Sequence, residues 1–133
     1  MIITEGKTIQ QVSDEIAAKL IVQGHRCILR SVPGIGSMCS YNDGNGNHCA
    51  IGWLLPEDHR CNEHHGGINS LISTWEDIGT NDQFIRDNWE ILEVLQDVHD
   101  NPSQLEITFL ECNGLDMTAW GEWISMDHTQ RSI

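Results

Sequence analysis

Seven cysteine and histidine side chains, the types that ligate zinc, fall within 27 residues of the chain. They are Cys39, His48, Cys49, His59, Cys61, His64 and His65. Four such ligands satisfy tetrahedral zinc, and the candidate set is Cys39, Cys49, Cys61 and His64. No Cys-x-x-Cys pair marks the segment. The alternative is that the cysteines pack as small hydrophobic residues under a solvated, histidine-rich loop, and both interpretations stay open.

Cys49 is also a candidate nucleophile. Its neighbour His48 would point to the opposite face of a strand, so the base would be His99, oriented by Asp100 or Gln96. In the alternative interpretation, His99 lies in the last turn of an acidic helix because the helix dipole favours an imidazole there. No phosphate loop or oxyanion-hole pattern accompanies these residues. Whether the chain is an enzyme therefore stays open.

The residues around these cysteines predict a β-hairpin. Two strand-like stretches, "MCSY" and "HCAIGWLL", flank "NDGNGN", whose Asn, Asp and Gly residues tolerate positive φ. In this hairpin Cys39 would lie opposite Cys49, so that the two thiols are neighbours. A further β-like run, "CILRSV", precedes the hairpin.

Helical patterns frame this β element. Thr8 and Gln11 have the spacing of a capping box, which predicts a helix over about 9–23 that ends at Gly24. A short helix is expected in "GGINSLISTWEDIGTND", and one longer helix in "DQFIRDNWEILEVLQDVHDN". The stretch "PSQLEITFLECNGLD" predicts another helix, with an inward face of Leu105, Phe109 and Cys112. The last amphipathic piece is "AWGEWISM".

The length of 133 residues fits one domain with one core, so residues 1–133 are expected to form a single domain. Its expected fold class is α+β, with helices packed around one β-hairpin. No apolar run approaches the roughly 18 residues of a membrane span, and the first residues lack a signal-peptide pattern. Five cysteines without a secretion signal are typical of a reducing compartment, so a cytoplasmic protein with free thiols is expected.

The formal charge of −13 restricts the partners. It disfavours bare nucleic acid and anionic membranes as ligands and favours proteins with a basic surface. Acidic residues crowd the segment 76–100, where Arg86 is the only Lys or Arg. Glu90, Glu93 and Asp97 are the candidate binding residues, because carboxylates on a rigid helix can occupy a groove built for phosphates. The alternative is an ordinary solvated helix face.

Two motifs, "C-S-Y … G-N-H-C-A-I-G-W-L-L-P" and "L-Q-D-V-H-D", give the chain a family resemblance. Residues from roughly 39 to 100 resemble a family of small proteins encoded by tailed phages and prophages. The positions that match its pattern are Cys39, Tyr41, Gly46, Cys49, Gly52, Pro56, Gln96, His99 and Asp100. The insert "HRCNEHHGG" and the many tryptophans depart from it. The resemblance implies a viral accessory role in the host cytoplasm and no known reaction.

On that resemblance, Tyr41, Gln96 and His99 join the acidic residues as candidate binding residues. The chain is expected to be a small acidic phage accessory protein that binds a host or viral macromolecule. Nucleic-acid mimicry is one mode by which it would bind. A zinc-binding or Cys/His-dependent hydrolase-type enzyme is the alternative.

Overall fold

The computed structural model describes residues 1–24, 28–32, 36–39, 41–42, 46–57, 61 and 67–126, and for 28–32 and 36–39 it describes the backbone. The α-helices in these ranges are α1 (Ile9–Gln23), α2 (Ile68–Thr74), α3 (Asp82–Asp87), α4 (Trp89–Asp100), α5 (Gln104–Cys112) and α6 (Gly121–Ser125). The 3-10 helices are η1 (Ile51–Leu54) and η3 (Thr118–Trp120), and the strands are β1 (Ile28–Val32) and β2 (Gly36–Cys39).

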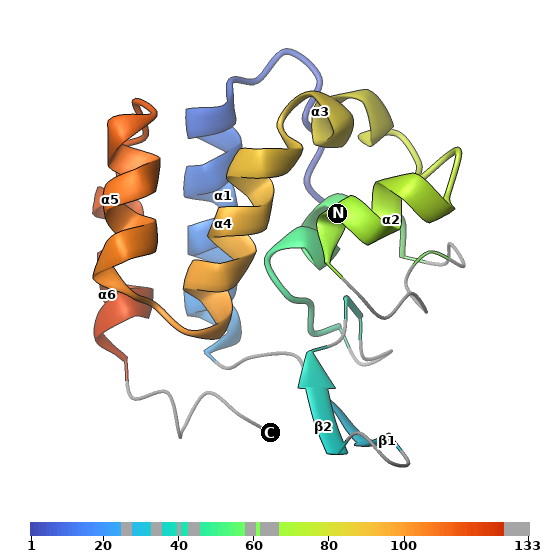
Figure 1. Cartoon of the computed structure of the whole chain (residues 1–133), viewed down its shortest axis with the longest axis horizontal. Coiled ribbons are helices and arrows are strands. Elements are labelled where there is room, and N and C mark those ends of the chain that lie inside the picture. Colours follow the sequence, from blue (N-terminus) through green and yellow to red (C-terminus); the bar gives the residue numbers. More distant parts are fainter. Residues whose placement is uncertain are drawn as a thin grey trace.

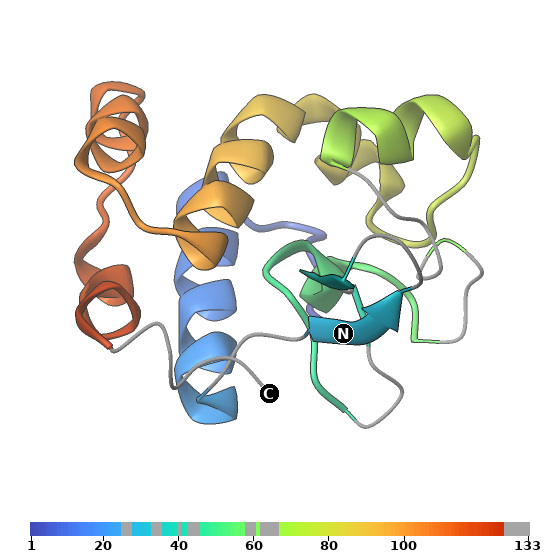
Figure 2. The same cartoon turned by 60° about the horizontal axis from the view of Figure 1, so that its bottom comes forward.

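Helix α4 is the central element of the described fold. It packs against α2, α3, α5 and α6, while α1 packs against η3 and α6. Figures 1 and 2 show α1 and α4 in the middle, α5 and α6 on one side, and α2 and α3 on the other. The antiparallel pair β1 and β2 projects from the edge of this helical body (Figure 1). No helix in the described part of the chain is long and apolar enough to cross a membrane.

Local signals place α1 as predicted. The Thr8 hydroxyl accepts a hydrogen bond from the Gln11 amide, and the Gln11 side chain accepts one from the Thr8 amide, which completes the capping box. Gly24 ends the helix in the left-handed region, with φ 82°. The buried face of α1 carries Val12 and Leu20, which join the core.

The predicted α+β fold class is wrong, because the part of the chain that the structure describes is helical and the expected hairpin does not form there. Cys39 pairs with Ile28 in the β1–β2 pair instead of lying opposite Cys49. The second expected strand contains η1, and one isolated bridge joins Asn42 to His48. The run "CILRSV" does contribute β1.

Gly52 allows η1 to pack closely against the Tyr41 backbone. A Cβ at Gly52 would overlap the carbonyl oxygen of Tyr41, so this close approach requires glycine. Ile51 and Leu54 on the same turn are buried in the core. A short apolar run such as "CAIGWLL" fits a buried turn as well as a strand, so hydrophobicity alone does not separate the two.

The single long helix expected from "DQFIRDNWEILEVLQDVHDN" is two helices. Asn88 interrupts the helix with φ −121° and ψ 20°, and its side-chain amide donates to the Phe84 carbonyl at 2.9 Å. Asparagine favours such local bonds over helix continuation. The interruption leaves α4 with its own first turn beside the end of α5.

Helix α5 exists as predicted, but its predicted inward face is wrong. Leu105 is 82% exposed, Phe109 is 41% exposed and Cys112 is also exposed, whereas Leu110 is fully buried. Apolar residues occur on several sides of α5, so its sequence pattern does not single out a face. Packing against α4 decides which side is buried.

Candidate binding surface on α4 and α5

Five carboxylates on α4 and α5 define the acidic face: Glu90, Glu93, Asp97, Asp100 and Glu106. The first three follow one side of α4 because residues three and four apart are neighbours on a helix. Partial burial, followed by the nearby carboxylates of Glu106, Asp100 and Glu93, raises the pKa of Asp97 above its usual value. This shift indicates that α5 brings Glu106 close to the carboxylates of α4.

Glu106 adds an unusual feature to the acidic face. Its Oε2 atom is buried and has no hydrogen-bond partner among the described residues. A buried carboxylate oxygen without a donor is costly, because it has lost water without gaining a replacement. The acidic face therefore includes one buried carboxylate oxygen, at Glu106, that no donor in the described part of the fold satisfies.

The sequence around the acidic face lacks cations. Residues 87–126 contain nine Asp and Glu residues and no Lys or Arg. The preceding cation, Arg86, is already engaged: its Nε donates to Asp82 at 3.0 Å and its Nη1 donates to the Ile72 carbonyl at 2.8 Å. Arg86 therefore ties α3 to α2 and does not neutralise α4.

A hollow of about 200 Å³ lies where the first turn of α4 meets the end of α5. Its lining includes Trp89, Glu90, Ile91, Phe109, Asn113 and Asp87. Two aromatic side chains and two carboxylates thus border one recess. We call it the aromatic hollow.

Three predicted residues, Gln96, His99 and Asp100, form a network that joins α4 to its neighbours. His99 is fully buried, and its Nδ1 donates to the Asp100 carboxylate at 2.8 Å, since a carboxylate only accepts. Gln96 accepts from the Ile51 amide at 3.2 Å and so holds η1. The Trp123 ring stacks on His99 with a centroid distance of 5.2 Å and donates to the His99 carbonyl.

This network restricts what His99 can do as a candidate base. Its Nε2 atom is buried and has no hydrogen-bond partner within the described ranges. The thiol of Cys49 accepts instead from the Gly52 amide, at 3.3 Å. The predicted nucleophile and base are therefore not joined by a hydrogen bond. Cys49 and Tyr41 are both buried, so neither they nor His99 lie on the surface that presents the carboxylates.

The metal prediction is only partly covered by the described residues. His64 and the side chain of Cys39 lie outside them, as do His59 and His65. Cys61 is fully buried, and burial raises the pKa of its thiol to about 11, which keeps it protonated at neutral pH. Among the residues whose side chains are described, no three His, Cys, Asp or Glu groups come together as a metal site requires.

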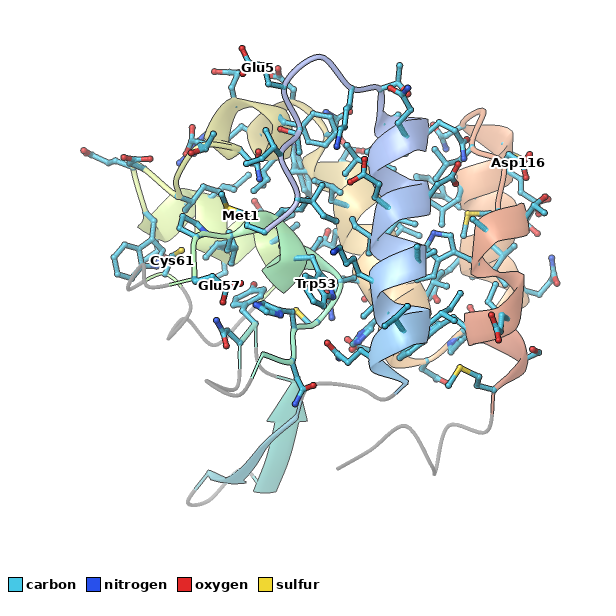
Figure 3. All side chains as sticks on the ribbon, turned by 180° about the vertical axis from the view of Figure 1, so that it is seen from behind. Met1, Glu5, Trp53, Glu57, Cys61 and Asp116 are labelled. Atoms are coloured by element: carbon cyan, nitrogen blue, oxygen red, sulfur yellow. The ribbon has the colours of Figure 1, made fainter. Side chains whose placement is uncertain are left out.

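His48 has protein partners of its own. It is buried, its Nε2 lies 3.0 Å from a carboxylate oxygen of Glu57, and its ring packs on Trp53 at a centroid distance of 4.2 Å. The Gln23 side chain bonds both the amide and the carbonyl of His48. Figure 3 shows Trp53 and Glu57 in the same region of the molecule as Met1. These contacts attach the segment after β2 to α1.

The sequence did not indicate that Trp89, Phe109 and Asn113 line one recess, in which Phe109 and Asn113 are exposed and Trp89 is partly buried against the core. The sequence predicts one long helix that runs through Trp89, and it places Phe109 on the inward face of α5. The local signal for Trp89 was Asn88, which favours a helix start. No local signal identifies Phe109, because its exposure depends on how α5 packs against α4.

Comparison of the chain with protein-family models, curated proteins and solved structures gives no match. The resemblance to tailed-phage proteins therefore stays a prediction from the motifs.

Proposed function

We propose that this protein binds a host or viral protein with a basic surface through the acidic face, as a non-enzymatic accessory protein in the cytoplasm of a phage-infected cell. One observation carries the proposal: partial burial and, after it, the nearby carboxylates of Glu106, Asp100 and Glu93 raise the pKa of Asp97, in a segment of 40 residues without Lys or Arg. The motif resemblance to tailed-phage proteins supports the cellular setting.

The chemistry of the face suits a basic groove. Carboxylates on packed helices hold their spacing, so little conformational entropy is lost when a partner aligns its cations with them. Opposite charge also steers the encounter and raises the association rate. A groove that normally holds phosphates presents this pattern of cations, and the protein would therefore compete with nucleic acid for such a groove.

The alternative, a Cys/His-dependent or zinc enzyme, has weaker support. The His99 ring is buried under Trp123, and the Cys49 thiol is engaged with Gly52. The raised pKa of Cys61 disfavours this thiol as a nucleophile. A catalytic role would need these buried groups to become accessible to a substrate.

The test compares two triple variants of equal charge. The first, Glu90→Gln/Glu93→Gln/Asp97→Asn, removes carboxylates from the acidic face. The second, Glu5→Gln/Glu76→Gln/Asp77→Asn, removes three exposed carboxylates elsewhere. Each immobilised protein is incubated with bacterial host lysate at about 50 and about 500 mM salt, which spans weak to strong screening. Captured proteins are then challenged with a DNA duplex.

We expect the wild type and the second triple variant to capture the same set of proteins. These proteins should be released at high salt and displaced by DNA. The first triple should capture at least about tenfold less, because three charge contacts are gone. Cys49→Ala and His99→Ala should retain capture wherever melting curves show folded protein. Full capture by the first triple at both salt levels would contradict the proposal.

A further inference from the structure

The exposed apolar residues of α5 form a stripe on the helix that also carries Glu106 of the acidic face. Leu105, Phe109 and Cys112 are spaced i, i+4 and i+7, so they follow one side of the helix. Leu105 at 82% exposure is one of the two most exposed large apolar side chains among the described residues. A single exposed leucine needs no explanation, but a stripe of three on one helix face is typical of a contact surface.

The stripe continues into the aromatic hollow. Phe109 belongs to both, since it is partly exposed on α5 and also lines the recess with Trp89 of α4. Asp87 and Glu90 border the same recess. A cation over an aromatic face, with a carboxylate within reach, is a favourable arrangement for a Lys or Arg side chain. The hollow therefore has the chemistry of a socket for one basic side chain.

Charge decides which partner can cover this surface. A second copy of the chain would bring another −13 against the same carboxylates, which opposes self-association. Acidic or neutral segments would leave Glu90, Asp97 and Glu106 without cations. A basic segment supplies them, and it must also present apolar side chains to Leu105 and Phe109.

We propose that the surface made by the acidic face, the apolar stripe of α5 and the aromatic hollow docks an amphipathic basic helix of the partner protein. Apolar residues of that helix cover Leu105 and Phe109, flanking Lys and Arg residues meet the acidic face, and one of them enters the aromatic hollow. This inference rests on the proposed function and specifies its partner. Recognition by apolar residues at helical spacing with a charged border is a recurring mode of helix-in-groove binding.

The probe is a synthetic peptide of 18 residues made of Leu, Lys and Ala, with Leu at helical i, i+3, i+4 and i+7 spacing. Its control is a scrambled peptide of identical composition without an apolar face. A helix of this length spans about 27 Å, more than the roughly 18 Å of α4. Binding is measured by isothermal titration calorimetry and by amide chemical shifts at low and high salt.

Three variants separate the apolar contribution from the charge contribution. Leu105→Gln/Phe109→Gln removes the stripe, and Val22→Gln is the matched control because Val22 is 88% exposed on α1. The triple Glu90→Gln/Glu93→Gln/Asp97→Asn removes charge. The wild type should bind the amphipathic peptide about tenfold or more tightly than the scrambled one, since covering apolar side chains adds affinity. The double variant should lose this preference, and Val22→Gln should keep it.

The outcomes distinguish the inference from the proposed function. Equal affinity for the two peptides, or a preference that survives Leu105→Gln/Phe109→Gln, overturns the amphipathic helix while a salt-sensitive loss in the triple still supports an acidic binding face. No loss in the triple with either peptide overturns the proposed function. A dimer of the wild type in analytical ultracentrifugation that the double variant abolishes would identify a second copy as the occupant and overturn the inference.

Discussion

At the scale of single residues, two glycines in helical turns have opposite environments. Gly52 lies against the Tyr41 backbone, where a Cβ has no room. Gly121 has helical dihedral angles, φ −56° and ψ −43°, and a Cβ there would meet nothing within 4 Å. The same substitution should therefore have opposite effects at the two positions.

We expect Gly52→Ala to lower the free energy of unfolding by about 1 to 3 kcal/mol, because the new methyl group forces the Tyr41 segment away from η1. Gly121→Ala should raise it by up to about 1 kcal/mol, since alanine restricts the unfolded chain and favours the helix. Urea titrations of both variants measure the two changes. Equal changes of the same sign would show that the contact between Gly52 and Tyr41 is not rigid.

Cysteine reactivity should follow burial. Cys112 is exposed, whereas Cys49 and Cys61 are buried and burial raises the pKa of Cys61 to about 11. Because the thiolate is the reactive form, iodoacetamide at pH 7.5 should alkylate Cys112 in the native protein and leave Cys49 and Cys61 intact until urea unfolds it. Peptide mass spectrometry measures the extent of alkylation at each cysteine. Rapid alkylation of Cys61 in the native protein would contradict its burial.

At the scale of secondary-structure elements, α5 combines a buried side with an apolar exposed side. Leu110 is fully buried, and Leu105, on the same helix, is 82% exposed. Leu110→Ala should cost about 2 to 4 kcal/mol of unfolding free energy, because it leaves a cavity next to α4. Leu105→Ala should change it by less than about 0.5 kcal/mol, as an exposed substitution does. Thermal and urea unfolding measure the stability of the two variants. A larger loss of stability for Leu105→Ala than for Leu110→Ala would mean that Leu105 lies on the buried side of α5, as the sequence predicted.

The sequence predicted elements whose signals are local. Thr8, Gln11 and Gly24 mark both ends of α1, and their bonds form within one turn. Its predictions were wrong where tertiary packing matters: η1, in place of the expected strand, packs Gly52 against the backbone of Tyr41, eleven residues away in sequence. Rules based on hydrophobic periodicity within one element cannot predict a contact between two separate segments.

For the candidate site, too, the sequence predicts the local features and not those that depend on tertiary packing. That Glu90, Glu93 and Asp97 share one side of α4 follows from helical spacing, so these residues could be named from the sequence. The approach of Glu106 and the exposure of Phe109 depend on the packing of α5 against α4. A pattern within either helix cannot encode them, because that packing is tertiary.

At the scale of the whole molecule, the distribution of charge makes stability depend on pH. Partial burial and neighbouring carboxylates raise the pKa of Asp97, whereas hydrogen bonds from the Thr118 hydroxyl and amide lower the pKa of Asp116. A raised carboxyl pKa means that the folded state loses stability as pH rises through it. A lowered one means that stability is lost as pH falls.

Asp97→Asn should therefore raise the melting temperature at pH 7, and its advantage over the wild type should disappear as pH falls below the ordinary aspartate pKa of about 4. Asp116→Asn should lower the melting temperature at pH 7, with the difference also vanishing in acid. Added salt should shrink the Asp97 effect, because screening weakens the repulsion from Glu93, Asp100 and Glu106. Melting curves from pH 3 to 7 check the signs, and an acid-independent gain for Asp97→Asn would exclude repulsion as its cause.

The packing of α1 against η3 and α6 also bears on biosynthesis. The Trp120 indole donates to the buried Ser13 hydroxyl at 3.0 Å, across 107 residues of chain. At a translation rate of about 5 to 20 residues per second, α1 waits about 5 to 20 seconds after its own synthesis before this partner exists. During that interval its apolar side, with Val12, Ile16 and Leu20, has no native cover from the C-terminal helices. The nascent chain thus offers a transient hydrophobic segment to chaperones, and α1 gains its contacts with η3 and α6 only after these two elements have left the ribosome.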